Sequence, residues 1–307
     1  MRPLRGITLK LGSVLIFIVM ASMIKATAQH VPPGQAVFFR SFFAIPVIVV
    51  WLLLRGELAT GMQTRQPMGH VWRGLMGTVA MGLGFAGLGY LPLPEVTAIG
   101  YAAPLLTVIF AAMFLGEEVR AFRITTVAIG LTGVLIVLAP RLTMHSSVAA
   151  AQAEAFGAVL VLGGAVFAAL AQVQVRKLVT VEKTAAIVFW FSVTASGLSL
   201  VTLPFGWVIP TAGEAALLVG AGLLGGVGQI LLTSSYREAE ASLVAPFDYA
   251  SMIFALLIGY FIFDEVPTRA MLVGAAIVVF AGILIIWRER QLGLQRARQR
   301  KAMTPQG

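Results

Sequence analysis

Three charged side chains interrupt apolar stretches of this sequence, and they are the residues best placed to do chemistry. Lys25 and Arg40 each lie within a long apolar run, and Asp248 stands between Phe247 and Tyr249. A charge at the centre of a bilayer costs about 2.5 kcal/mol or more, so it commonly marks a ligand site or an ion pair. We expect Lys25 and Arg40 to bind an anionic group of a ligand. We expect Asp248 to carry a coupling proton or cation, or to accept a hydrogen bond from a ligand amine.

A structural alternative stays open for each of these three residues. Lys25 and Arg40 lie near one end of their apolar runs, so their charged heads could reach interfacial water while their stems stay in lipid. Asp248 could be protonated and could join two helices through a hydrogen bond, because an unpaired carboxylate is costly in an apolar environment. The sequence alone does not decide between binding and packing.

Five uncharged side chains are weaker candidates to contact a ligand. They are Tyr101, Gln172, Trp190, Gln229 and Tyr249. Tyr101 aligns with Asp248 in an internal repeat. Gln172 and Gln229 could face a cavity, but amides inside membrane spans commonly join helices at about 0.6 kcal/mol each. Trp190 could form the aromatic wall of a cavity or belong to a stripe that faces lipid.

The sequence lacks the patterns of several other chemistries. It has no cysteine, which excludes disulfides, thiolate metal sites and cysteine nucleophiles. The histidines His30, His70 and His145 lie far apart and show no metal-ligand spacing. The run Gly82–Gly87 fits GxGxxG, but it follows no strand and no acid lies about 20 residues on, so we reject a dinucleotide site. We expect no catalytic residues, no metal and no cofactor.

Composition indicates that the helices carrying these residues cross a membrane. Of 307 residues, 59% are apolar and 11% are charged, and the mean hydropathy is +0.92. Soluble domains carry roughly 25% charged residues. The net charge of +9 does not indicate nucleic acid, because the cations lie between apolar runs and form no soluble basic face. We predict an all-α membrane protein with ten transmembrane helices, near residues 7–28, 35–54, 73–92, 95–115, 123–139, 155–175, 184–206, 214–235, 241–263 and 269–287.

The distribution of Lys and Arg predicts the orientation of these spans. With the N-terminus in the cytoplasm, all of the 22 cations except Lys25, Arg40, Arg141 and Arg269 fall on the cytoplasmic side. This bias follows the positive-inside rule. It predicts a multi-pass protein of a bacterial-type inner membrane with both termini cytoplasmic. We expect the basic cytoplasmic tail, residues 291–307, to be disordered or to lie on the membrane surface.

An internal repeat divides the chain into two halves. Tyr101–Glu118 resembles Asp248–Glu265, and each is followed by another apolar run. The predicted topology gives the two copies opposite orientations, which is a common arrangement in transporters. The predicted inverted five-helix repeats are residues 1–140 and 150–290. Pro104 and Pro246 each remove a backbone donor within a span, so we expect a helix kink at both.

This pattern resembles the EamA family of the drug/metabolite transporter superfamily. Its best marks are Ala98–Pro104 with Leu115–Glu117 in the first half, and Ser242–Pro246 with Phe263–Glu265 in the second. The resemblance covers about residues 7–287, although Asp264 stands where the family usually has glycine. It implies a secondary transporter, an exporter or exchanger, that moves a small organic metabolite without ATP. Amino acids and vitamins such as riboflavin are substrate classes that the family permits. The implied partners are that small molecule and the lipid bilayer, and a coupling proton is compatible with them.

Alternatives from other classes stay open at this point. An intramembrane enzyme would need polar catalytic groups at one depth, whereas the polar residues of these spans are few and scattered. A non-transporting accessory protein would explain the apolar mass but not the repeat. In addition, Arg2, Arg5 and Lys10 precede an apolar run ending in Ala26–Ala28, which resembles a signal peptide. Its cleavage would leave four helices facing five.

Overall fold

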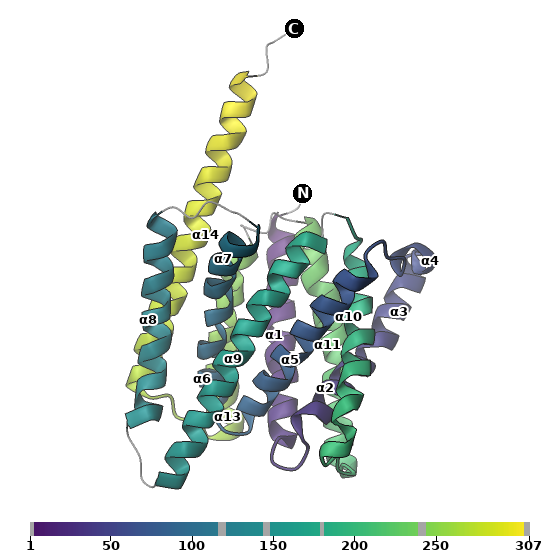
Figure 1. The fold of residues 1–307 in the computed structure, drawn as a ribbon, viewed down its shortest axis with the longest axis vertical. Helices are drawn as coiled ribbons and strands as arrows, with labels where there is room; N and C mark the ends of the chain where they lie inside the picture. Colours follow the sequence, from purple (N-terminus) through teal and green to yellow (C-terminus); the bar gives the residue numbers. More distant parts are fainter. Residues whose placement is uncertain (1–2, 116–120, 144–147, 179–180, 239–243, 304–307) are drawn as a thin grey trace.

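The protein is a bundle of helices that stand side by side. We describe it from a computed structural model over residues 3–115, 121–143, 148–178, 181–238 and 244–303, and every regular element in these ranges is a helix. In Figure 1 the helix α1 (Pro3–Thr27) begins at the upper end of the bundle and ends at the lower end. These two ends are called upper and lower throughout.

Most of the long helices are continuous. They are α1, α5 (Pro67–Leu88), α8 (Ala121–Thr143), α9 (Val148–Leu178), α10 (Thr184–Ser199), α11 (Ala212–Glu238) and α14 (Arg269–Met303). A backbone that crosses lipid must satisfy its own polar groups, and a helix does so within one segment. Proline starts α5 at Pro67, where its missing N–H would be unpaired in any case.

Three predicted spans are each built from two shorter helices. They are α2 (Pro33–Phe42) with α3 (Ala44–Leu54), α6 (Leu93–Gly100) with α7 (Ala102–Leu115), and the 3-10 helix η2 (Ala245–Tyr249) with α13 (Ala250–Phe263). The short elements are α4 (Leu58–Gly61), between α3 and α5, and η1 (Leu200–Phe205), which extends α10. Each of the ten predicted segments therefore overlaps a described helix or pair of helices.

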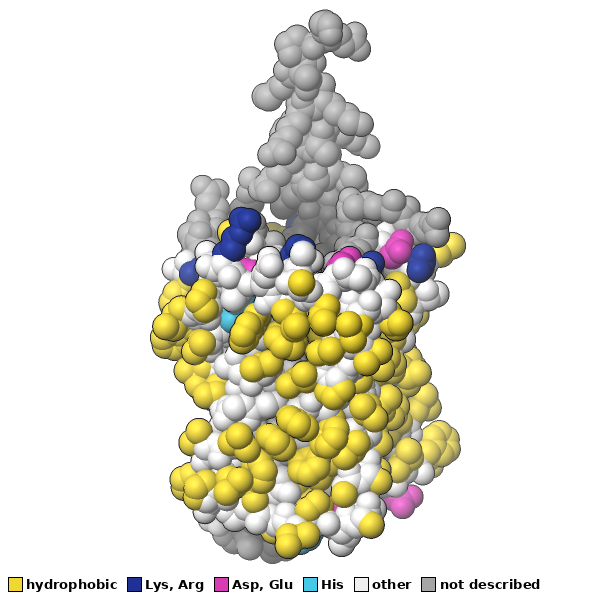
Figure 2. Space-filling view, turned by 90° about the vertical axis from the view of Figure 1, so that its right-hand side faces the viewer, with side chains coloured by type: hydrophobic (Ala, Val, Ile, Leu, Met, Phe, Trp, Pro, Cys, Tyr) yellow, Lys and Arg dark blue, Asp and Glu magenta, His cyan; other side chains and the backbone are white. Residues whose placement is uncertain are grey.

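Length and hydropathy identify nine of these helical stretches as candidate membrane spans within the described residues. A tenth apolar stretch, Ile124–Pro140 in α8, is shorter. On the face drawn in Figure 2, hydrophobic side chains cover the middle of the bundle, and Lys and Arg side chains gather at its upper end. The prediction of an all-helical membrane protein is confirmed.

The helices of the first half pack against those of the second half. The largest contacts pair α1 with α11, α5 with α9 and α8 with α14, and smaller ones pair α7 with α9, α5 with α10, α2 with α10, and α6 with α13. Figure 1 shows α8 beside α14 and α5 beside α9. Each of the three clusters of buried apolar residues therefore combines side chains from both halves.

The last predicted span agrees with the candidate span Arg269–Arg288, but the tail after it is not disordered up to Met303. Helix α14 continues to that residue and projects from the upper end of the bundle (Figure 1). The basic residues of the tail follow a helix up to that point, because no proline or glycine pair interrupts the sequence after the span. Other predicted features, Glu117, Glu118, Ser242 and His145, lie outside the described residues.

Glycines allow α8 and α14 to meet backbone against backbone. A Cβ on Gly133 would lie 2.8 Å from the carbonyl oxygen of Gly274, and a Cβ on Gly274 would lie 2.6 Å from that of Gly133. Apolar side chains gain little by leaving lipid for another helix, so close packing of small residues is what joins helices in a membrane. These two glycines therefore fix the distance between α8 and α14.

We predict that Gly133→Ala destabilises the protein by about 1–3 kcal/mol, because the added methyl group forces the two helices apart. The matched control is Gly197→Ala in α10, where a Cβ would meet nothing within 4 Å. Thermal unfolding in detergent micelles should show a lower midpoint for Gly133→Ala only. Equal midpoints for the two variants would contradict this account of the helix contact.

Candidate functional site

The fourth and ninth spans are both interrupted, and they cross each other at the interruption. The fourth span breaks at Tyr101, between α6 and α7, and the ninth begins as the 3-10 helix η2 before α13 takes over at Ala250. Pro104 is the third residue of α7, and Pro246 is the second residue of η2. Both prolines thus lie within one turn of an irregular backbone.

Two tyrosines form the contact at this crossing. The ring of Tyr101 meets the ring of Tyr249 edge to face, with 4.9 Å between centroids. The Tyr101 hydroxyl shares a hydrogen bond with the Ser251 hydroxyl and donates to the Tyr249 carbonyl oxygen at 3.4 Å. The Tyr249 hydroxyl packs against Gly282 of α14, where no larger residue would fit. The structure therefore brings together two of the predicted site residues, Tyr101 and Tyr249.

Asp248 lies beside this crossing and is paired with a lysine from α1. Lys10 Nζ is 2.7 Å from Asp248 Oδ1, and the Lys10 side chain is 1% exposed while that of Asp248 is 50% exposed. The sequence predicts Lys10 only as one of the cytoplasmic cations, and its burial and its pairing with Asp248 are not predicted. The carboxylate is thus anchored on one side by a buried ammonium group and is open on the other.

Lys25 is engaged at the lower end of the bundle. Its Nζ lies 2.9 Å from Glu265 Oε1 and donates to the carbonyl oxygens of Leu88 at 3.2 Å and Leu91 at 2.8 Å. The other Glu265 oxygen accepts a hydrogen bond from the Leu93 N–H at 2.8 Å. Because an ammonium group has three protons, these three acceptors leave no donor for a ligand. In this conformation the Lys25 ammonium group is bound within the protein, and it neither extends to interfacial water nor has a free N–H for a substrate.

These contacts also fix the relative directions of three spans. Lys10 and Lys25 follow the same order along α1 as their partners Asp248 and Glu265 along the ninth span, so these two spans run parallel. In contrast, the start of the fourth span at Leu93 meets Glu265 at the end of the ninth. The fourth and ninth spans are therefore antiparallel.

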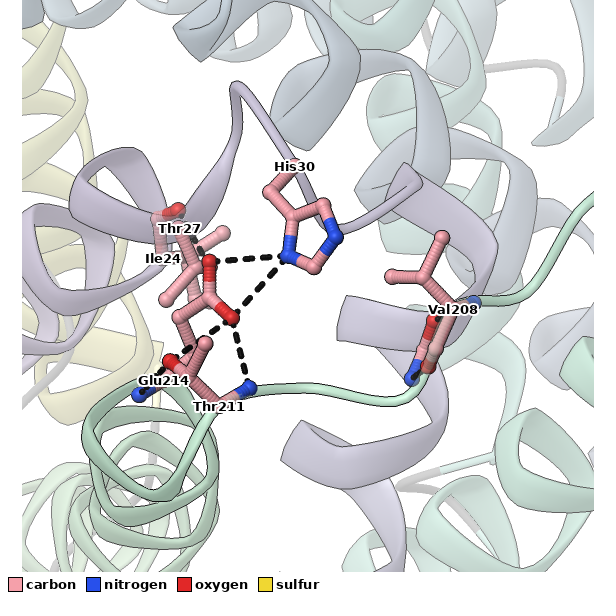
Figure 3. Close-up of polar contacts among 7 residues, drawn as sticks. Ile24, Thr27, His30, Val208, Thr211 and Glu214 are labelled. Atoms are coloured by element: carbon pink, nitrogen blue, oxygen red, sulfur yellow. Dashed lines mark hydrogen bonds and ion pairs between the residues drawn. The ribbon is translucent and has the colours of Figure 1, made fainter.

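Further polar contacts tie loops of the two halves together at the lower end (Figure 3). His30 Nδ1 lies 3.0 Å from both carboxylate oxygens of Glu214, which also accepts from the N–H and hydroxyl of Thr211 at the start of α11. Such a reciprocal Thr–Glu arrangement caps a helix N-terminus. The Gln35 amide donates to the Val208 carbonyl oxygen at 2.8 Å and accepts from its N–H at 3.1 Å.

Arg40 lies in a second cluster, in the interior beside α10. The Arg40 side chain is 3% exposed, and its Cζ is 5.7 Å from the centroid of the Phe191 ring. Arg73 of α5 approaches the same ring, with its Cζ 3.5 Å from the centroid. The Arg40 guanidinium does not extend to interfacial water, because its Nε and Nη1 atoms are buried in the bundle. Arg73 was missed because the third span was predicted to start at that residue, whereas α5 starts at Pro67.

A glutamate anchors the start of α5 and thereby positions Arg73 almost two turns later. Glu182 Oε1 accepts hydrogen bonds from the N–H groups of Arg65 and Gln66 and from the Thr64 hydroxyl. Burial raises the pKa of Glu182, but these hydrogen bonds outweigh burial, so the pKa lies below its usual value. Glu182 is therefore ionised at neutral pH and holds the entry to α5 against the loop before α10.

The remaining predicted candidates lie apart from these clusters or serve as structural contacts. Trp190 Nε1 donates to the Met62 carbonyl oxygen at 2.9 Å, which ties α10 to the loop before α5. Gln172 is exposed on α9, and Gln229 is half-buried on α11. Within the described residues, no group of histidines and carboxylates has the geometry of a metal site.

Comparison with known proteins identifies the family. The sequence profile of the EamA-like transporter family matches residues 4–139 and, a second time, residues 155–288. The chain belongs to the EamA-like transporter family. Family members are transporters and not enzymes, which removes the intramembrane-enzyme alternative, and the resemblance drawn from the sequence is confirmed.

Named relatives of this EamA-like protein handle different small molecules. It is 30% identical to a pseudopaline exporter of Pseudomonas aeruginosa, over 91% of this chain and 95% of the relative. It is 28% identical to an S-adenosylmethionine uptake transporter of Rickettsia bellii, over 94% and 97% of the two chains. It is 28% identical to a riboflavin transporter of Rhizobium johnstonii, over 84% and 82%. A solved crystal structure, 20% identical, shares the fold with a TM-score of 0.65 over 94% of this chain and 98% of its own.

We predict that Lys25→Met destabilises the protein by about 2–4 kcal/mol, because Glu265 is left charged and mostly buried. The control is Arg55→Met, which removes the exposed partner of Glu57 at 4.0 Å and should cost at most about 1 kcal/mol. Thermal unfolding in detergent micelles measures both. The double variant Lys25→Glu with Glu265→Lys should recover part of the stability lost in Lys25→Met. Equal losses of stability in Lys25→Met and Arg55→Met would contradict a stabilising Lys25–Glu265 ion pair.

Proposed function

We propose that this protein is a secondary transporter that exports or exchanges a small organic metabolite across the inner membrane. In this proposal, ten spans form two inverted five-helix repeats, residues 1–140 and 150–290, and both termini are cytoplasmic at the upper end. Two observations support the repeat: the family profile matches each half separately, and the fourth and ninth spans run antiparallel. The cations gathered at the upper end support the orientation.

The observation that carries the proposal is the crossing of two interrupted helices between the halves. Transporters built from inverted repeats commonly place their sites near the middle of the membrane, where discontinuous helices meet. Here Tyr101 and Tyr249 meet at such a point, and Asp248 presents a half-exposed carboxylate next to them. We infer that this crossing lines the substrate path and that the proline-bearing segments bend when the halves rock.

Relatives indicate the chemical range of the substrate but not its identity. The three relatives described above are named for pseudopaline, S-adenosylmethionine and riboflavin, which differ in charge and shape. We propose that the substrate is a small polar metabolite such as an amino acid, an amino-acid derivative or a vitamin. Arg40 in the interior and the Tyr101–Tyr249 crossing are the groups placed to hold it. Gln172, Trp190 and Gln229 stay as weaker candidates.

The test is counterflow in proteoliposomes made with the purified full chain. Vesicles preloaded with an unlabelled compound should transiently accumulate the same labelled compound, and the panel comprises riboflavin, S-adenosylmethionine and the common amino acids. Tyr249→Ala should lower the initial rate at least tenfold, because the crossing loses its ring contact, whereas Tyr260→Ala, at an exposed position, should not. A panel with no counterflow above that of empty vesicles would contradict the proposal.

Coupling to protons is predicted to depend on Asp248. Asp248→Asn keeps the shape of the side chain but removes the charge that Lys10 neutralises and the group that could take up a proton. We expect the variant to keep counterflow but to lose accumulation driven by a pH gradient. Glu238→Gln, which removes the partner of Arg5 at 3.4 Å, serves as control. If Asp248→Asn still accumulates substrate with the wild-type dependence on the gradient, the carboxylate does not carry the proton.

A further inference from the structure

Two arginines from different helices converge on one aromatic ring inside the bundle. Arg40 of α2 and Arg73 of α5 lie with their Cζ atoms 5.7 Å and 3.5 Å from the centroid of Phe191 of α10. Two cations that share one ring lie close enough to repel each other, and this repulsion is strong where little water screens it. A chain that only needed to pack these helices would avoid such a pair.

Within the described part of the chain, no acidic side chain neutralises either arginine. The Nε and Nη1 atoms of both side chains are buried and have no hydrogen-bond partner among the described residues. No carboxylate of the described residues lies within ion-pair distance of either one, whereas Lys10 and Lys25 are held by Asp248 and Glu265. Buried polar groups in folded proteins are normally paired, so a cluster of unpaired donors requires an explanation.

Packing on Phe191 explains only part of this arrangement. A guanidinium group over an aromatic face is favourable, and this accounts for the position of Arg73. It does not account for a second cation at the same ring, because the ring supplies no hydrogen-bond acceptors for either group. The donors of Arg40 and Arg73 therefore call for an acceptor that carries negative charge.

Glycines let α5 and α11 pack closely against the side chains of the cluster. Gly225 of α11 faces Arg40, and a Cβ there would lie 3.3 Å from the Arg40 Nε atom. Gly77 of α5 faces Phe191, and a Cβ there would lie 2.7 Å from the ring. Larger residues at these two positions would crowd the guanidinium and the ring.

We propose that Arg40 and Arg73 together bind the carboxylate groups of the transported metabolite, so that the substrate class is a small organic acid or an amino acid with an acidic side chain. Guanidinium groups form short, charge-assisted hydrogen bonds with carboxylates, and two of them suit a dicarboxylate better than a single carboxylate. Phe191 holds the two groups in place. This inference rests on the proposed function and specifies the substrate class for it.

The test is binding of succinate to the purified full chain in detergent, measured as a shift of the thermal unfolding midpoint at constant ionic strength. Succinamide, which has the same skeleton without charge, is the reference compound. Succinate should raise the midpoint of the wild-type protein more than succinamide does. Arg40→Gln and Arg73→Gln should each weaken succinate binding tenfold or more, and Arg73→Lys should recover only part of it.

Arg55→Gln is the matched control, because Arg55 also lies over an aromatic ring, with its Cζ 5.2 Å from the centroid of Trp51, but is exposed. It should bind succinate as the wild type does. If a glutamine variant does not fold, the lysine variants of Arg40 and Arg73 supply the comparison. Equal shifts by succinate and succinamide, or wild-type binding in the glutamine variants, would overturn the proposal. Sulfate binding of equal strength and equal arginine dependence would overturn the assignment to carboxylates.

Binding and transport fail in different ways. Succinate binding that depends on the two arginines, without counterflow of any compound, would retain the anion site and contradict the transporter proposal. Counterflow of a neutral or cationic compound, unaffected by Arg40→Gln and Arg73→Gln, would retain the transporter and overturn the anion site. The two proposals can therefore be judged separately.

Discussion

A charge inside a membrane-spanning bundle has to be compensated, and this constraint organises the interior of the protein. Two lysines meet it with carboxylates: Lys10 with Asp248 and Lys25 with Glu265. In each pair the cation comes from the first half and the acid from the second. A buried ion pair often adds little net stability over apolar residues, but loss of one partner is costly. The pairs therefore specify how the halves meet more than how stable they are.

The two ion pairs differ in how far the surrounding protein encloses them, and this indicates which end of the bundle is more tightly closed. They lie fifteen residues apart on α1, which corresponds to about 22 Å along a helix. At the lower end Glu265 is 13% exposed and is joined to Lys25 and the Leu93 N–H, while Asp248, further up the bundle beside the tyrosine crossing, is 50% exposed. The Lys10–Asp248 pair is therefore less enclosed by protein than the Lys25–Glu265 pair. A rocking motion that keeps the spans intact would therefore start from a state whose lower end is the more firmly closed.

The sequence predicts the helices well because long apolar runs leave few alternatives in a membrane, and it identifies Lys25, Arg40 and Asp248 because charges stand out against such runs. It fails where a span begins with polar residues. Residues 67–73 contain His70 and Arg73 and look like a loop, yet α5 starts at Pro67 and places Arg73 inside. Lys10 is hidden in the same way by Arg2 and Arg5. The partners are harder still, since a contact such as Lys25 with Glu265 joins residues 240 positions apart and leaves no local pattern.

Packing and charge follow different symmetries in this fold. The helix contacts are similar when the two halves are interchanged. The first and eighth predicted spans (α1 and α11) pack together as the sixth and third (α9 and α5) do, and the fifth packs on the tenth (α8 on α14). The charged side chains described in the interior do not follow this symmetry: Lys10, Lys25, Arg40 and Arg73 come from the first half. The second half supplies carboxylates to the two lysines, and no described carboxylate pairs with either arginine. A symmetric scaffold can rock between two similar states, but it cannot by itself distinguish one solute from another. The asymmetric charge is therefore the feature that can give this transporter its selectivity, and an anionic ligand is what would complete it.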